Sequence, residues 1–274
     1  MKLYLSVDME GITGVPDYTF VDSSKHNYER ARRIMTEETN YVIRSAMENK
    51  ADEVLVNDSH SKMNNLLIDE IHPDATLITG SVKPLSMVQG LDDSFSGALF
   101  VGYHARAAQK GVLSHSMTFG VRNFYINDTP VGELGFNAYV AGYYGVPVLM
   151  VAGDDCAAQE AEALIPNVVT APVKETISRS AVKSLTPKKA GELLEERTAQ
   201  ALQNRTRVEP LVPPDYPTLR IEFMNYGQAE WANLMPGTDL EPNSTTVRFR
   251  AKDILEAYQA MLVMTELAMQ TTSS

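Results

Sequence analysis

Short apolar segments that each end in a cluster of polar residues recur along the first 155 residues of the chain. They lie at 2–7, 53–57, 98–101 and 146–152, and patterns of helical periodicity follow the first and the last of them, at 28–47 and 157–164. Strand, polar cluster and helix in repeated succession are typical of a mostly parallel sheet. We therefore predict an α/β fold, with a mostly parallel sheet flanked by helices.

The pattern changes beyond about residue 172. A helix is predicted at 187–203 because Thr186 can cap it and Pro187 occupies its first position. A proline-rich connector, two strands and a second helix are then predicted, at 209–217, 218–224, 245–251 and 254–269. We predict a metal-binding catalytic α/β domain over 1–172 and a smaller α+β domain over 173–274, which we expect to contribute to assembly.

Charge and cysteine content restrict the classes of partner and compartment. The 274 residues carry a net charge of -11, which argues against nucleic acid or an anionic membrane as the main partner. Cys156 is the only cysteine, so an internal disulfide is excluded and a reducing compartment is favoured. The pattern of a signal peptide and the apolar run of about 20 residues that a membrane span needs are both missing from the sequence. We predict a cytoplasmic protein.

Two carboxylates, Asp8 and Glu10, follow the first predicted strand. Residues two apart in an extended chain point to the same side, so both side chains emerge together. Two unpaired carboxylates at this distance repel each other and are costly to bury, so a divalent metal between them is the favoured interpretation. The alternative is an exposed strand end with two solvated acids.

Two histidines and a third acid are the other candidate ligands. His60 and His104 each follow a predicted strand, and Glu133 lies between two glycines ahead of a predicted helix at 137–144. The carboxyl ends of parallel strands meet at one edge of a sheet, where functional groups collect. Imidazole nitrogen and carboxylate oxygen together suit zinc, with manganese or cobalt as alternatives.

The charges of these candidates favour two ions over one. Asp8, Glu10 and Glu133 supply three negative charges, whereas neutral His60 and His104 supply none. Two divalent cations bridged by hydroxide would leave the site close to neutral. Asp8, which is nearest to its strand, is our choice for a bridging ligand. Paired metals of this kind activate water and polarise a carbonyl, which is the chemistry of amide hydrolysis.

His115 and Cys156 remain as candidates for catalysis. His115 lies between two serines and can act as general acid, general base or oxyanion stabiliser, although a structural role is an equal alternative. Cys156 follows two aspartates, which disfavour its thiolate, so a packed or capping cysteine is expected. Two other functions stay open at this point: a magnesium-dependent phosphohydrolase that uses Asp8, and a non-enzymatic, metal-stabilised dipeptide-binding module.

Five motifs along the chain together resemble one known family, the zinc-dependent, self-compartmentalising bacterial D-aminopeptidases of the DppA type. The motifs are Ser-Val-Asp-Met-Glu-Gly at 6–11, Asn-Asp-Ser-His-Ser at 57–61, Gly-Tyr-His at 102–104, Ser-His-Ser at 114–116 and Gly-Glu-Leu-Gly at 132–135. The resemblance covers essentially the whole chain, with no departure at a ligand position.

The resemblance implies a site, a substrate and an assembly. It implies release of N-terminal D-amino acids, typically D-alanine, from short peptides such as D-Ala-D-Ala. It also implies a homodecamer that encloses its active sites, with His115 as the catalytic side chain. The ligands that it implies for two zinc ions per subunit are Asp8, Glu10, His60, His104 and Glu133.

Overall fold

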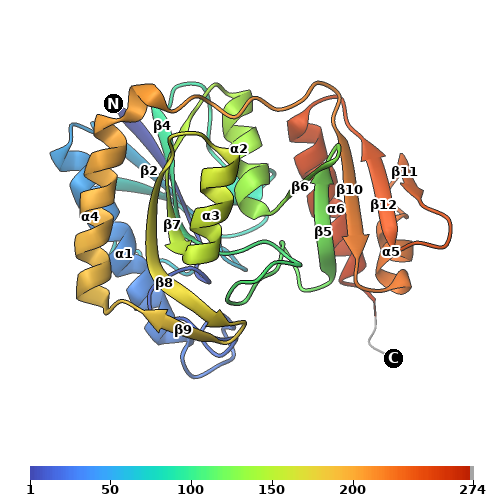
Figure 1. Ribbon diagram of the computed structural model, residues 1–274, viewed down its shortest axis with the longest axis horizontal. Coiled ribbons are helices and arrows are strands. Elements are labelled where there is room, and N and C mark those ends of the chain that lie inside the picture. The colour runs from blue at the N-terminus through green and yellow to red at the C-terminus, as the bar shows by residue number, and fades with distance from the viewer. Residues whose placement is uncertain (272–274) are drawn as a thin grey trace.

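Two β-sheets organise the computed structural model, which describes residues 1–271 (Figure 1). The larger sheet contains β1 (Lys2–Val7), β2 (Glu53–Asp58), β3 (Ala75–Ile78), β4 (Gly97–Tyr103), β7 (Val148–Asp154), β8 (Val169–Ser178) and β9 (Ala181–Ser184). Their order is β3-β2-β1-β4-β7-β8-β9, and every neighbouring pair is parallel except β8 and β9. This sheet confirms the predicted fold class.

Helices cover both faces of the larger sheet (Figure 1). On one face α1 (Tyr28–Glu48) packs against α4 (Pro187–Gln203), and on the other lie α2 (Glu133–Tyr143) and α3 (Asp155–Leu164). The buried stripe of α1 includes Ala31, Met35 and Val42, which recur at helical spacing. All residues of β4 and β7 are buried, as expected for central parallel strands covered on both sides.

The order of the parallel strands reverses between β1 and β4. The connections that leave these two neighbouring strands run to opposite sides of the sheet, which opens a crevice outside their carboxyl ends. The polar clusters after β1, β2 and β4 therefore meet at one edge of the sheet.

A second, antiparallel sheet lies beside the larger one (Figure 1). Its strands are β5 (Val121–Ile126), β6 (Thr129–Val131), β10 (Thr218–Phe223), β11 (Thr238–Leu240) and β12 (Thr246–Arg250), in the order β11-β12-β10-β5-β6. Two helices, α5 (Tyr226–Ala232) and α6 (Ile254–Ala268), pack on it. Short 3-10 turns at Ser86–Val88 and Arg205–Arg207 complete the elements of the described chain.

The two sheets do not follow the division predicted at residue 172. A boundary there cuts β8, and it separates β5 from its partner β10 on the far side. Strands β8 and β9 and helix α4 belong with the larger sheet, so the chain enters the second sheet at β5, leaves it after β6 and returns at β10. As a statement about independently folding units, the division stays a prediction. No helix within residues 1–271 is long and apolar enough to cross a membrane.

Candidate metal centre

The structure brings the six predicted site residues together at the carboxyl edge of the larger sheet. Asp8 and Glu10 follow β1, His60 follows β2, His104 follows β4, and Glu133 is the first residue of α2. All five are buried, with exposures of 2% to 8%. The sixth residue, His115, reaches the cluster from the loop between β4 and β5.

A close approach of two backbone segments places Asp8 and Glu10 beside the end of β4. The amide of Asp8 donates to the carbonyl oxygen of Val101 at 2.8 Å, and that of Gly11 donates to Gly102 at 2.7 Å. Gly102 has a φ of +73°, and a Cβ on it would lie 2.1 Å from the carbonyl oxygen of Asp8. Only glycine fits there, which explains why glycine precedes the Tyr-His pair.

Asp8 lies between two histidines and presents one oxygen to each. Its Oδ1 is 3.3 Å from His60 Nδ1, and its Oδ2 is 3.5 Å from His104 Nε2. Glu10 Oε2 approaches His60 Nδ1 at 2.9 Å, and Glu133 Oε2 approaches His104 Nε2 at 3.4 Å. The cluster therefore consists of two carboxylate–imidazole groups that share Asp8.

Each of the three histidines has one ring nitrogen committed to a backbone carbonyl. Because a carbonyl oxygen only accepts, His60 Nε2, His104 Nδ1 and His115 Nδ1 carry the protons. In the neutral rings the other nitrogens hold lone pairs, and these face the carboxylates. The accepting oxygens belong to Val21, Ala105 and Leu113, at 2.8, 3.0 and 2.9 Å respectively.

The electrostatics of the cluster call for added positive charge. Burial, with the neighbouring charge of Glu10, raises the pKa of Asp8 to about 7. Burial would also raise the pKa of Glu10 and Glu133, but nearby histidines outweigh it and lower both. Burial would lower the pKa of His60 and His104, yet the carboxylates raise it well above the ordinary value. In the protein alone, protons on the imidazoles supply the positive charge that a metal ion would otherwise supply.

Two buried atoms show that a metal fits this site. Asp8 Oδ2 and His104 Nε2 have no hydrogen-bond partner among the described residues. Leaving such buried polar atoms unpaired is costly, and a bound cation would satisfy both. Imidazole nitrogen and carboxylate oxygen are donors that zinc accepts.

His115 packs against the cluster through its ring. Its plane stacks on that of His104 at 4.3 Å and 2°, and its Nε2 lies 3.9 Å from Glu10 Oε1 and 3.8 Å from Glu133 Oε1. Burial, together with the neighbouring His104, lowers the pKa of His115, so its imidazole is neutral at neutral pH. His104, His115 and Glu133 also converge closely enough to hold an ion, so the geometry permits His115 either as a proton carrier or as a ligand.

Lys174 is a buried residue of the site that sequence reasoning missed. Its side chain enters from β8 with an exposure of 2%, and its ammonium group donates to the carbonyl oxygens of Glu10, Ile12 and Val15. Burial lowers its pKa to about 8. Lys174 therefore fastens the backbone that carries Glu10 and the start of the loop at 12–27, and nothing in its local sequence marks this role.

Asp58 holds the loop that carries His60. Its carboxylate accepts hydrogen bonds from the amides of Asn65 and Leu66, at 2.5 and 2.7 Å. Asn65 in turn donates to the carbonyl oxygen of His60 at 2.7 Å. The Asn-Asp-Ser-His-Ser motif contained Asp58, but its partners lie outside the motif.

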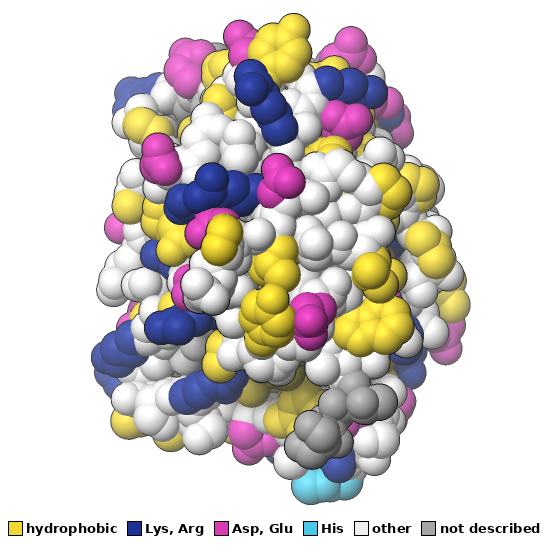
Figure 2. All heavy atoms as spheres, turned by 90° about the vertical axis from the view of Figure 1, so that its right-hand side faces the viewer, with side chains coloured by type: hydrophobic (Ala, Val, Ile, Leu, Met, Phe, Trp, Pro, Cys, Tyr) yellow, Lys and Arg dark blue, Asp and Glu magenta, His cyan; other side chains and the backbone are white. Residues whose placement is uncertain are grey.

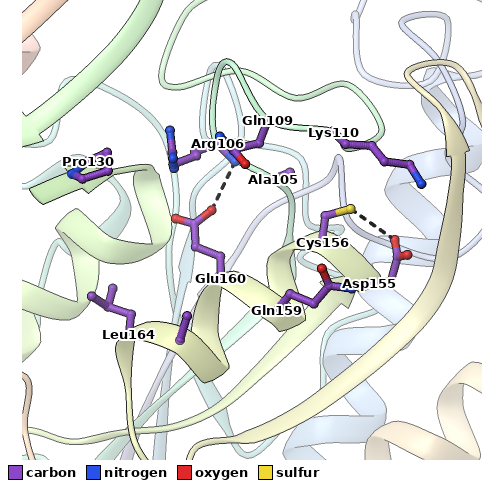
Figure 3. A pocket seen from close by; sticks show the side chains of 11 residues that line it. Ala105, Arg106, Gln109, Lys110, Pro130, Asp155, Cys156, Gln159, Glu160 and Leu164 are labelled. Carbon is purple, nitrogen blue, oxygen red and sulfur yellow. Dashed lines mark hydrogen bonds between the residues drawn. The ribbon is translucent and has the colours of Figure 1, made fainter.

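The Asp154–Cys156 segment lies beside the cluster and not in it. Asp154 caps α3 by accepting from the amide of Ala157 at 2.7 Å, and burial raises the pKa of the Cys156 thiol, consistent with a packed cysteine. The segment borders a cavity of about 450 Å³ between α3 and the loop at 105–110 (Figure 3). None of the six clustered residues lines this cavity.

Comparisons with known proteins agree with the motifs. A family model described as D-aminopeptidase matches residues 1–263. A D-aminopeptidase from Bacillus subtilis (strain 168) is 73% identical over 272 residues, which cover 99% of each chain. A solved structure described as the Zn-dependent D-aminopeptidase DppA from Bacillus subtilis, a self-compartmentalizing protease, superimposes with a TM-score of 0.99 at 72% identity over all of both chains.

Proposed function

The chain belongs to the D-aminopeptidase family of peptide hydrolases, and we propose that it releases N-terminal D-amino acids, D-alanine above all, from short peptides at a two-zinc centre. The single observation that carries the proposal is the buried cluster in which one ring nitrogen of each of three histidines faces three carboxylates, while the other ring nitrogen is held by a backbone carbonyl. Three buried carboxylates repel one another unless positive charge lies among them, and a metal ion supplies that charge while leaving the ring nitrogens free to bind it. The zinc dependence stated for the solved relative supports this choice of metal.

The shared position of Asp8 supports two ions. Asp8 and Glu10 with His60 offer one set of donors, and Asp8 and Glu133 with His104 offer the other. When bound, the zinc pair would polarise the scissile carbonyl and lower the pKa of a coordinated water towards about 7. A magnesium phosphohydrolase is less favoured, because magnesium prefers oxygen ligands to imidazole.

We assign proton transfer to His115. Its Nδ1–H is fixed on the Leu113 carbonyl, so the neutral ring has its lone pair at Nε2, on the side of Glu10 and Glu133. Nε2 can take a proton from the attacking water and return it to the leaving amine.

Self-assembly into a decamer is the second part of the proposal. The solved relative is described as self-compartmentalizing, which requires several copies of one chain. Figure 2 shows hydrophobic side chains distributed over the side formed by the second sheet and its helices. Exposed apolar residues of α5, α6 and their connections include Met224, Tyr226, Trp231, Leu234 and Val263. Mass determination by light scattering tests the copy number.

Location in the cytoplasm is proposed from the free thiol of Cys156, which fits a reducing compartment.

The deciding experiment combines metal content with stereospecific hydrolysis. We expect about two zinc ions per chain by mass spectrometry, and chelator-sensitive hydrolysis of D-Ala-D-Ala but not of L-Ala-L-Ala. Zinc without D-selectivity would retain the metal centre and overturn the substrate assignment. A metal-loaded protein that binds dipeptides without turnover would favour a binding module instead.

A further inference from the structure

A row of ring contacts leads outward from His115. Its imidazole packs on Phe119 at 4.7 Å, and the guanidinium of Arg179 lies over the same phenyl ring at 5.5 Å. Tyr18 meets the edge of Phe119 at 6.1 Å. Phe119 and Tyr18 are 47% and 49% exposed, so this row links the buried centre to the surface.

Arg179 stands at the turn between β8 and β9, beside the loop that carries His115. Its carbonyl oxygen accepts from the amide of Leu113 at 2.9 Å, and its Nη2 donates to the carbonyl oxygen of Ser114 at 3.3 Å. Within residues 1–271, no carboxylate forms an ion pair with the guanidinium, and the side chain is exposed. Most of its five N–H donors therefore remain available to a ligand.

The two ends of this row suit the two ends of a short peptide. The inner end is the metal centre, formed by Asp8, Glu10 and Glu133 with the histidines, where the proposed function places the N-terminal residue of the substrate. The outer end holds one cation, Arg179. A guanidinium fork binds a carboxylate through two parallel hydrogen bonds, which is the geometry that a peptide C-terminus offers.

We propose that Arg179 binds the C-terminal carboxylate of a short peptide whose N-terminal residue occupies the metal centre. The inference rests on the proposed function and adds a determinant of peptide length to it. Each further residue extends a peptide by about 3.3 to 3.6 Å. A cation at one fixed distance from the metal centre therefore binds the carboxylate of peptides of one short length. Longer peptides place their carboxylate elsewhere and lack this contact.

Arg106, another cation near this edge of the sheet, is less suited to the role. Arg106 lines the cavity of Figure 3 together with the carboxylate of Glu160, which would repel an incoming carboxylate. Its Nη1 already donates to the Ala107 carbonyl and to Asn123 Oδ1, at 3.3 and 3.4 Å. Arg106 also lacks the ring contacts that connect Arg179 to His115.

The test compares D-Ala-D-Ala with its C-terminal amide, using the zinc-loaded protein. We expect the wild type to prefer the free acid in kcat/KM, and Arg179→Met to lower this acid-to-amide ratio about tenfold, mainly through KM. Arg179→Lys should restore part of the ratio. Lys183→Met removes an exposed cation from the same hairpin, where it pairs with Glu175, and should not alter the ratio.

Three other results are informative. An unaltered ratio in Arg179→Met would overturn the inference, and so would an equal loss on both peptides, because the latter would mean that Arg179 only holds the loop of His115. If the wild type cleaves neither peptide, the proposed function itself fails, and this inference fails with it.

Discussion

The ammonium group of Lys174 donates a hydrogen bond to the carbonyl oxygen of Glu10, and both residues are buried. Replacing this lysine by methionine, Lys174→Met, should leave three backbone carbonyls without their donor and lower the free energy of unfolding by about 3 kcal/mol or more. Urea denaturation measures the change. Lys183→Met, at an exposed position on β9, is the control and should change little. A loss for Lys174→Met as small as that of the control would contradict the role.

Alanine substitutions at Gly102 and Gly14 distinguish two costs of an added Cβ: a clash with the backbone of Asp8, and the strain of a positive φ. Both have positive φ, +73° and +72°, but only Gly102 has atoms within reach of an added Cβ. Gly14→Ala should cost about 1 to 2 kcal/mol, the ordinary penalty of the left-handed conformation. Gly102→Ala should cost clearly more and also lower zinc content, because Asp8 must move. Equal unfolding free energies for the two variants would show that the close approach is unimportant.

Local sequence patterns predicted the elements with strong periodicity or capping signals. The helix predicted at 187–203 has those bounds, since proline at its first position fixes its start. The short strands β3, β9 and β11 and the helix α5 were missed. Strands of three or four residues offer too few positions for a period to emerge. Strand β8 was not predicted either, because it contains Pro172 and proline is uncommon inside strands.

The sequence predicted those site residues that are possible metal ligands and that directly follow a predicted strand. Asp8, His60 and His104 could be placed together because parallel strands align their carboxyl ends. Lys174 could not, since it meets Glu10 from 164 residues away, through a contact that only the packed sheet creates. The backbone carbonyls that orient the histidines carry no sequence signal at all. The assignment of the clustered acids and histidines as metal ligands remains a prediction.

Stability should depend on pH through Glu38, a buried carboxylate on α1 that accepts from the amide of Thr13 at 2.9 Å. Burial raises its pKa from 4.5 to about 7. Below about pH 4.5 the folded and the unfolded protein both hold the proton, and the contribution to stability is complete. Between 4.5 and 7 only the folded protein holds it, so this contribution falls as the pH rises and is lost once the pH passes about 7. The unfolding free energy of the wild type relative to Glu38→Gln should therefore fall by up to about 3 kcal/mol between pH 5 and 7.5. Glu48→Gln, on the exposed side of α1, is the control, and identical profiles for the two variants would disprove the assignment.

Zinc content and turnover should separate His115 from the two other clustered histidines. His60→Ala and His104→Ala each remove a nitrogen that faces the shared Asp8, so both should lose zinc and activity together. His115→Ala should retain zinc while its kcat falls about 10²- to 10⁴-fold, the usual contribution of a general acid–base group. His26→Ala, at an exposed loop position, is the matched control and should retain both. If His115→Ala loses zinc as His104→Ala does, then His115 acts with His104 and Glu133 as a ligand, and the assignment of proton transfer to His115 is wrong.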